Sequence, residues 1–281
     1  MRSRYLVAVF IILLAASTAQ AQGGPPLLSD DPETPGRSNW EVYVGAEYSR
    51  QGDIGIYKAP EIEANYGPTD RTQIKIKIPW TTMSRQGHDT IDGLGNITLG
   101  LKWHFLDRDG FSMSVYPQFE ANTPTNAADR GLVDLGSKFY LATEVMKEWQ
   151  KLCLGAEVEY SHAQYGTDLV FYGVYLQYHP VEYLDLLAEL ASESPTGVVP
   201  EDWLYNFGFR YHFNDTYALI ASAGGALGGA GNNAPDMIAY LGVQFDIDVK
   251  PNDKDRNEPK TPPPQAGLYD GFPRAGLGVS R

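Results

Sequence analysis

A hydroxyl nucleophile and an imidazole base stand side by side in this sequence, at Ser161 and His162. Such a pair supports acyl transfer only when the two groups come within hydrogen-bond reach of each other. Both residues lie in a segment that alternates like a β-strand, where neighbouring side chains point to opposite faces. The other four histidines lie in separate segments: His88, His104, His179 and His212. We therefore expect no catalytic residues and no enzyme activity.

Metal and cofactor chemistry also has little support in the sequence. Asp30-Asp31 and the pair Asp89 and Asp92 are short acidic groups, but neither belongs to a complete calcium or zinc pattern. Cys153 is the single cysteine, so the chain has no internal disulfide and no cysteine-based zinc site. The net charge of −13 argues against binding to nucleic acid, whose phosphates require a basic face. We expect no metal, no cofactor and no nucleic-acid partner.

The elements that position the polar side chains must be β-strands, because apolar and polar residues alternate along most of the chain. The clearest alternation runs from Arg71 to Thr81 and sets Ile74, Ile76 and Ile78 against polar neighbours. Segments of about ten residues with this alternation are typical of tilted strands in a transmembrane barrel. In such strands the apolar residues face lipid and the polar residues face the lumen.

Twelve segments of this kind can be delimited: 39–49, 58–66, 71–81, 96–105, 111–122, 133–143, 151–162, 168–178, 184–194, 203–213, 217–226 and 237–247. The connections between them alternate between short and mostly longer. A membrane barrel explains this, because its periplasmic turns are tight and its outer loops are longer. The sequence predicts an all-β fold, a transmembrane antiparallel up-and-down β-barrel of about 12 strands over residues 39–248. The predicted location is the bacterial outer membrane.

Charged residues recur on the polar face of these segments, which predicts a wet lumen. A Lys or Arg that faced lipid at the midplane would cost about 2–4 kcal/mol. By parity, the predicted lumen-lining residues are the acids Glu41, Glu47, Glu61, Glu63, Glu120, Asp134, Glu157, Glu159 and Glu189 and the bases Lys75, Lys77, Lys102, Lys138 and Arg210. These charges either fill the lumen with ion pairs or line a path for solutes. Twelve strands lie between the eight that side chains can fill and the sixteen that leave a channel, so both interpretations stay open.

The turn predicted at Gly67–Arg71 sets the register of one hairpin. Centred on this turn, the hairpin places Glu61 opposite Lys77 and Glu63 opposite Lys75. Opposite charges at facing positions stabilise a strand pair by roughly 0.2–1 kcal/mol each. The sequence therefore predicts two lumenal ion pairs in this hairpin.

Three segments lie outside the predicted barrel. Residues 1–21 read as a signal peptide, because Arg2 and Arg4 precede an apolar run and Ala19-Gln20-Ala21 fits the cleavage pattern. Residues 22–38 are Pro-rich and acidic, and we expect an N-terminal periplasmic segment outside the barrel. Residues 249–281 are polar and Pro-rich, which predicts a disordered periplasmic tail.

The chain contains several short motifs: the run from Gly24 to Glu33, Pro60 to Gly67, Leu94 to Asn96, Gly100 to Trp103, and Arg130 to Leu132. Together they resemble the outer-membrane transporter family of the meta-pathway of phenol degradation. The resemblance spans about Gly24 to Ile247 and implies a barrel that passes hydrophobic or aromatic compounds. The run from Gly242 through Phe245 to Ile247 resembles the insertion signal of a last strand, although 34 residues follow Ile247.

We expect an outer-membrane channel or facilitator for the passive passage of small, aromatic or hydrophobic molecules. The expected partners are outer-membrane lipid, a small-molecule solute and the barrel assembly machinery during insertion. The alternative is a non-conducting outer-membrane barrel with a structural or binding role, tethered through its periplasmic tail.

Overall fold

The computed structural model describes residues 24–123, 126–227 and 234–249. In these residues the chain forms 13 β-strands that belong to one antiparallel sheet. No helix in the described ranges is long and apolar enough to cross a membrane. The predicted signal peptide, and all of the predicted tail except its first residue, lie outside the described residues.

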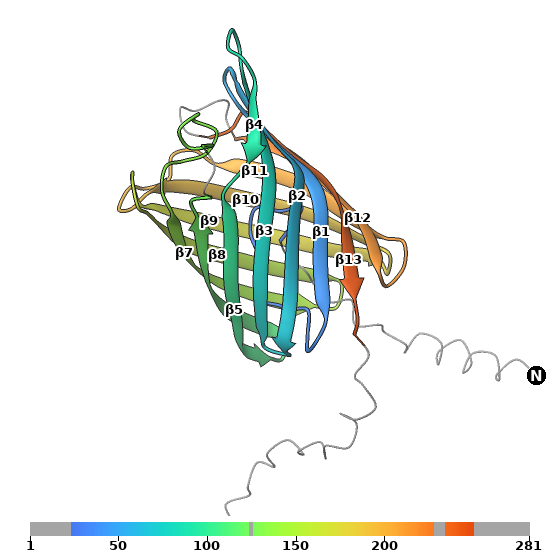
Figure 1. The fold of residues 1–281 in the computed structure, drawn as a ribbon. Helices are drawn as coiled ribbons and strands as arrows, with labels where there is room; N and C mark the ends of the chain where they lie inside the picture. The colour runs from blue at the N-terminus through green and yellow to red at the C-terminus, as the bar shows by residue number, and fades with distance from the viewer. Residues whose placement is uncertain (1–23, 124–125, 228–233, 250–281) are drawn as a thin grey trace, which may run out of the picture. The chain divides into compact units, whose positions relative to one another are not determined.

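The sheet closes on itself into a barrel (Figure 1). Consecutive strands pair around the wall, β13 pairs with β1, and β2 pairs with both β1 and β3. The strands are β1 (Trp40–Gln51), β2 (Ile54–Thr69), β3 (Thr72–Arg85), β4 (Ile91–Leu94), β5 (Ile97–Arg108), β6 (Phe111–Ala121), β7 (Lys138–Trp149), β8 (Leu152–Ala163), β9 (Leu169–Val181), β10 (Leu184–Pro195), β11 (Leu204–His212), β12 (Tyr217–Ala226) and β13 (Met237–Ile247).

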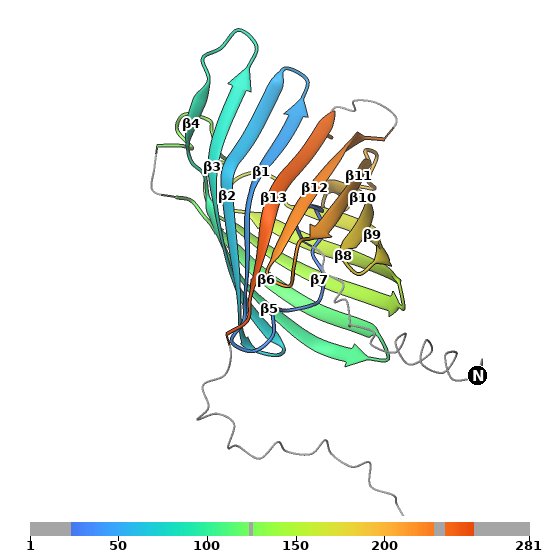
Figure 2. The same cartoon turned by 90° about the vertical axis from the view of Figure 1, so that its right-hand side faces the viewer.

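Twelve long strands make the wall, because β4 and β5 share one position in it. Both pair with β3, β4 through Trp80 opposite Leu94 and β5 through Thr72 opposite Trp103. Each of the twelve predicted segments corresponds to one long strand, so the predicted all-β antiparallel barrel is confirmed. The short β4 lies in a stretch that we expected to be a loop. Figure 2 shows β2 and β3, the longest strands, rising beyond most of the wall.

The predicted bounds of the sixth segment, 133–143, are wrong by about five residues. The strand β7 starts at Lys138, after a series of turns that includes Gly136 with a positive φ of 86°. Asp134 therefore lies in the connection before the strand. The stretch that we expected to be a turn after residue 143 continues the strand instead and carries Glu144, whose side chain is fully buried.

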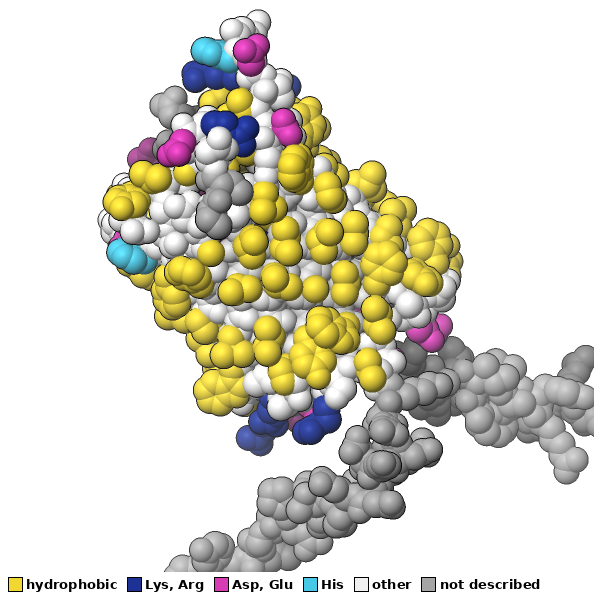
Figure 3. Space-filling model, viewed as in Figure 1, with side chains coloured by type: hydrophobic (Ala, Val, Ile, Leu, Met, Phe, Trp, Pro, Cys, Tyr) yellow, Lys and Arg dark blue, Asp and Glu magenta, His cyan; other side chains and the backbone are white. Residues whose placement is uncertain are grey.

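The outside of the barrel is apolar. Ile74 is 49% exposed, while its neighbours Gln73 and Lys75 are buried, and the same alternation recurs on the other strands. Figure 3 shows hydrophobic side chains over most of the visible face of the wall, with charged side chains concentrated towards its two ends. An exposed apolar band around a closed barrel is the surface that a lipid bilayer covers. The molecule therefore has the architecture of an outer-membrane barrel.

The segment before β1 does not lie outside the barrel, so that prediction is wrong. Residues 24–33, here named the N-terminal insert, lie inside the lumen, and Ser29 and Asp31 are buried there. Residues 34–38 leave at the turn between β2 and β3, where Arg37 forms an ion pair with Asp70. The sequence misled us because a Pro-rich acidic stretch has no alternation of its own. Its position depends on polar groups that the wall presents to it.

Candidate functional site

The end of the lumen with the longer connections holds a cavity of about 1180 Å³, here named the vestibule. Its wall comes from residues of β2, β3 and β5 to β11. Its rim comes from the connections around Leu135, Val199 and Pro235. Leu28 and Asp30 of the insert lie at its inner end. A space of this size accommodates a small organic molecule.

The predicted lumen residues fall into three groups. Those that line the vestibule are Glu61, Lys75, Lys77, Glu120, Asp134, Lys138, Glu157 and Glu159. Those that line a much smaller pocket of about 20 Å³ on the other side of the insert are Glu41, Glu63 and Lys102. The remaining three lie elsewhere: Glu47 forms an ion pair with Lys58, and Glu189 and Arg210 bond the insert.

The hairpin of β2 and β3 carries both predicted ion pairs, although its register differs from the prediction. Lys77 lies 2.9 Å from Glu61 and Lys75 lies 3.2 Å from Glu63, measured from Nζ to a carboxylate oxygen. In the backbone register, however, Glu63 faces Lys77, so the ion pairs are diagonal. The strands continue up to a two-residue turn, which moves the pairing by three positions, and a β-bulge between Tyr66 and Thr69 moves it back by one, so the net shift is two positions. An even shift keeps every side chain on its predicted face.

The opposite wall of the vestibule is mainly acidic. Asp134 forms an ion pair with Lys138 there, and other carboxylates of this wall bond neutral donors. Glu120 accepts hydrogen bonds from Asn96 and Tyr140, and Glu159 accepts one from Gln118 at 3.2 Å. Glu193, which the sequence analysis did not select, also lines this wall. The lysines of β2 and β3 already have carboxylate partners on their own side. The vestibule as a whole therefore has a negative field.

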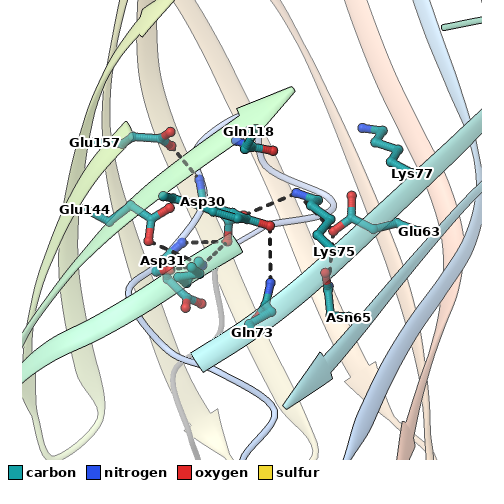
Figure 4. Close-up of polar contacts among 12 residues, drawn as sticks. Asp30, Asp31, Glu63, Asn65, Gln73, Lys75, Lys77, Gln118, Glu144 and Glu157 are labelled. Carbon is teal, nitrogen blue, oxygen red and sulfur yellow. Dashed lines mark hydrogen bonds and ion pairs between the residues drawn. The ribbon is translucent and has the colours of Figure 1, made fainter. Parts of the chain in front are cut away.

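The wall binds the main chain of the insert through carboxylates. Glu189 accepts the N–H groups of Leu28 at 3.0 Å and Ser29 at 2.6 Å. Glu157 accepts the N–H of Asp30 at 2.7 Å. Figure 4 shows Asp30 and Asp31 between the strand that carries Lys75 and the one that carries Glu157. Charge-assisted hydrogen bonds of this kind are stronger than neutral ones, so they hold the main chain of the insert firmly.

Two buried lysines bind the side chain of Asp30. Lys102 Nζ lies 2.9 Å from one carboxylate oxygen and Lys75 Nζ lies 3.5 Å from the other. Both ammonium groups lie over the ring of Tyr116, at 4.8 and 5.2 Å from its centroid. Burial alone would raise the pKa of Asp30, but Lys102 and Lys75 outweigh it and hold that pKa well below its ordinary value. Asp30 is therefore a firmly ionised anchor for the insert.

The carbonyl groups of Pro25 and Pro26 are bound by β11 and β12, next to the strand that carries Glu189. Arg210 donates to the carbonyl of Pro25 at 3.3 Å, and Ser222 donates to that of Pro26 at 2.7 Å. Asn206 donates to Pro26 as well. With the carboxylates and lysines, the polar contacts to the insert come from β3, β5, β8, β10, β11 and β12. These strands are far apart in the sequence, and only closure of the barrel brings them together.

Two further contacts hold the insert in place and involve no charged group. The side chain of Ser29 fills the space beside Gly173 of β9, where an added Cβ atom would lie 1.9 Å from Ser29 Oγ. Leu27 belongs to a buried cluster with Met146, Cys153, Tyr175 and Leu187. Sequence reasoning missed Glu144, Gly173, Asn206 and Ser222. The alternation of inward and outward residues would have identified Glu144 as a lumenal residue if the bounds of the sixth strand had been correct.

Ser161 and His162 point in different directions, as neighbouring strand residues must. The Ser161 side chain is buried inside the barrel, whereas that of His162 is 61% exposed and bonds Asp168. Across the ranges that the structure covers, no group of three or more His, Cys, Asp or Glu residues is arranged to hold a metal ion.

No protein-family model and no curated protein matches the sequence. In structure, the chain is similar to the COG4313 outer membrane channel from Pseudomonas putida F1, with a TM-score of 0.57 and 16% identity over 79% of this chain and 99% of that one. It is also similar to the NanC porin, with a TM-score of 0.54 and 10% identity, and to the KdgM porin, with 0.53 and 9%. Each porin match covers 73% of this chain and 98% of the porin. At these identities the likeness is one of fold, and the fold is that of a bacterial outer-membrane barrel.

Proposed function

We propose that this protein is an outer-membrane channel or facilitator for the passive passage of small molecules. The observation that carries the proposal is the vestibule, a cavity of about 1180 Å³ that extends from the rim connections to the insert. A barrel that served only as a scaffold would gain stability from a lumen filled by packed side chains. The fold neighbours named above, a channel and two porins, agree with this function.

The lining of the vestibule bears on the class of solute. Apolar side chains lie among the charged ones, including Ile56, Met83, Leu169 and Phe171. A ligand pocket typically combines apolar surface with a few polar groups that orient the ligand. This mixture, together with the resemblance to the phenol meta-pathway family, supports small aromatic or hydrophobic solutes. We also propose that the predicted lumen charges of the vestibule line the solute path.

The test is conductance of the purified protein in planar lipid bilayers, together with swelling of proteoliposomes in small neutral aromatic and aliphatic solutes. We expect discrete current steps and faster swelling than in protein-free liposomes. A membrane-inserted, folded protein that gives neither, in the wild type and also in a variant whose insert is released, would contradict the channel function.

The insert itself favours a second candidate, a non-conducting barrel with a structural or binding role. Its polar contacts reach six strands, and the pocket on its other side is small, about 20 Å³. The same bilayer measurement separates the two candidates, provided that it includes a variant in which the insert is released. A permanently closed barrel conducts no current in that variant either.

A further inference from the structure

The insert crosses the lumen between the vestibule and the end with the short turns. Leu28 lines the vestibule, Gly24, Asp31 and Glu33 line the 20 Å³ pocket, and Asp30 reaches both. A pocket of that size holds a water molecule but no organic solute. Any solute that traverses the barrel must therefore pass the insert.

We propose that the N-terminal insert is a releasable gate, which closes the lumen while it is bound to the wall and opens it when it leaves. The inference rests on the proposed channel function and concerns its regulation. It differs from a fixed plug in one respect, because the wall must remain stable after the insert has left.

The wall keeps partners for its buried charges when the insert leaves. Lys75 retains Glu63 at 3.2 Å, and Lys102 retains Glu144 at 3.3 Å. Glu189 retains a hydrogen bond from the side chain of Asn206 at 3.2 Å. An unpaired buried charge is strongly destabilising, and here release of Asp30 strips neither lysine of its wall carboxylate. Water from the vestibule can then hydrate the groups that had bound the main chain.

Gly173 gives independent evidence that the wall is shaped around the insert. It lies inside β9, opposite Glu157 of β8, and the side chain of Ser29 lies against it. Glycine weakens a strand interior, and one of its uses there is to let another part of the chain approach closely. An alanine at this position would place its Cβ atom 1.9 Å from Ser29 Oγ, so one of the two residues must move. Gly173→Ala therefore acts on the insert without changing any lumenal charge.

Cys153 provides a built-in reporter of the gate. It is the single cysteine of the chain, its side chain is fully buried, and it belongs to the same apolar cluster as Leu27 of the insert. A thiol in such a position reacts with an aqueous reagent only when the covering segment moves away. Its modification rate therefore measures release of the insert independently of any current.

The experiment compares wild type, Gly173→Ala, Asp30→Ala and the double variant Gly173→Ala with Ser29→Gly, all full-length and reconstituted in lipid. Labelling of Cys153 by a small charged thiol reagent and the open fraction in planar bilayers are measured for each. We expect both quantities to rise roughly tenfold or more in Gly173→Ala and in Asp30→Ala. Ser29→Gly removes the clashing hydroxyl and should restore both to near the wild-type values. Val174→Ala, at the next position on the lipid side, is the matched control.

The two readouts separate failure of the gate from failure of the channel function. Labelling at the wild-type rate in both single variants overturns the gate, as does a wild-type current that flows while Cys153 stays protected. Faster labelling without any current supports a releasable insert and overturns the channel function instead. A folded barrel is verified in each variant by its heat-dependent shift in gel mobility.

Discussion

Tyr175 of β9 packs directly on Gly155, the residue that faces it on β8. A Cβ atom added at Gly155 would lie 2.0 Å from Cζ of the Tyr175 ring. The ring lies flat against the lumenal side of the wall because its neighbour has no side chain. Tyr116 lies against Gly100 and Tyr240 against Gly45 in the same manner.

Gly155→Ala should lower the free energy of unfolding by about 1–3 kcal/mol, the usual cost of overpacking a well-packed interior. Urea unfolding of the protein in lipid vesicles measures this change. Tyr175→Ala in the same chain should remove most of the added cost, whereas Tyr175→Phe should not. If Gly155→Ala lowers the unfolding free energy equally with and without Tyr175→Ala, the Gly155–Tyr175 contact is not the cause of the loss.

Lys77→Met should destabilise the barrel, because it leaves the buried carboxylate of Glu61 without its ion-pair partner. The expected loss is about 1–3 kcal/mol in unfolding free energy, since Lys77 itself is partly exposed to the lumen. The double variant with Glu61→Gln should recover most of it. A double-mutant cycle measured by urea unfolding gives the coupling, and a coupling near zero would contradict the diagonal ion pair.

An open channel should prefer cations to anions. The lysines of β2 and β3 are paired on their own wall, and the carboxylates of the opposite wall leave the vestibule with a negative field. The reversal potential under a salt gradient measures this preference. Glu159→Gln should weaken it while leaving Glu157 to bind the insert, and Asp215→Asn, in a turn at the other end, should not. Anion preference in the wild type would contradict the charge assignment.

Deletion of residues 250–281 should leave a barrel that inserts and resists protease. The wall closes within the described residues, because β13 pairs with β12 on one side and with β1 on the other, from Trp40 opposite Ile247 onwards. Membrane fractionation and heat-dependent gel mobility of the truncated chain provide the measurement. Loss of the membrane-inserted form would show that the tail is needed for assembly.

Much of the wall is determined by local sequence. Alternation with a period of two residues decides which side chain faces lipid and which faces the lumen, and it depends only on neighbours along the chain. The strand from Thr72 to Arg85 is an example, with Ile74 and Ile76 outside and Lys75 and Lys77 directed inward. The same pattern predicted which charged side chains face the lumen, although it did not predict which residues pair across the hairpin.

The tertiary structure alone decided the register of the second hairpin and the place of the N-terminal insert. The register depends on where the chain turns and bulges. The strands pair as far as Thr69 and Thr72, which takes β2 into the predicted turn Gly67–Arg71, and a bulge follows between Tyr66 and Thr69. The insert has no periodicity, and its location is set by groups such as Glu189 and Ser222, which lie 160 or more positions away in sequence from the residues they bind. No local pattern can encode such contacts, because the groups that make them share one surface only after the barrel has closed.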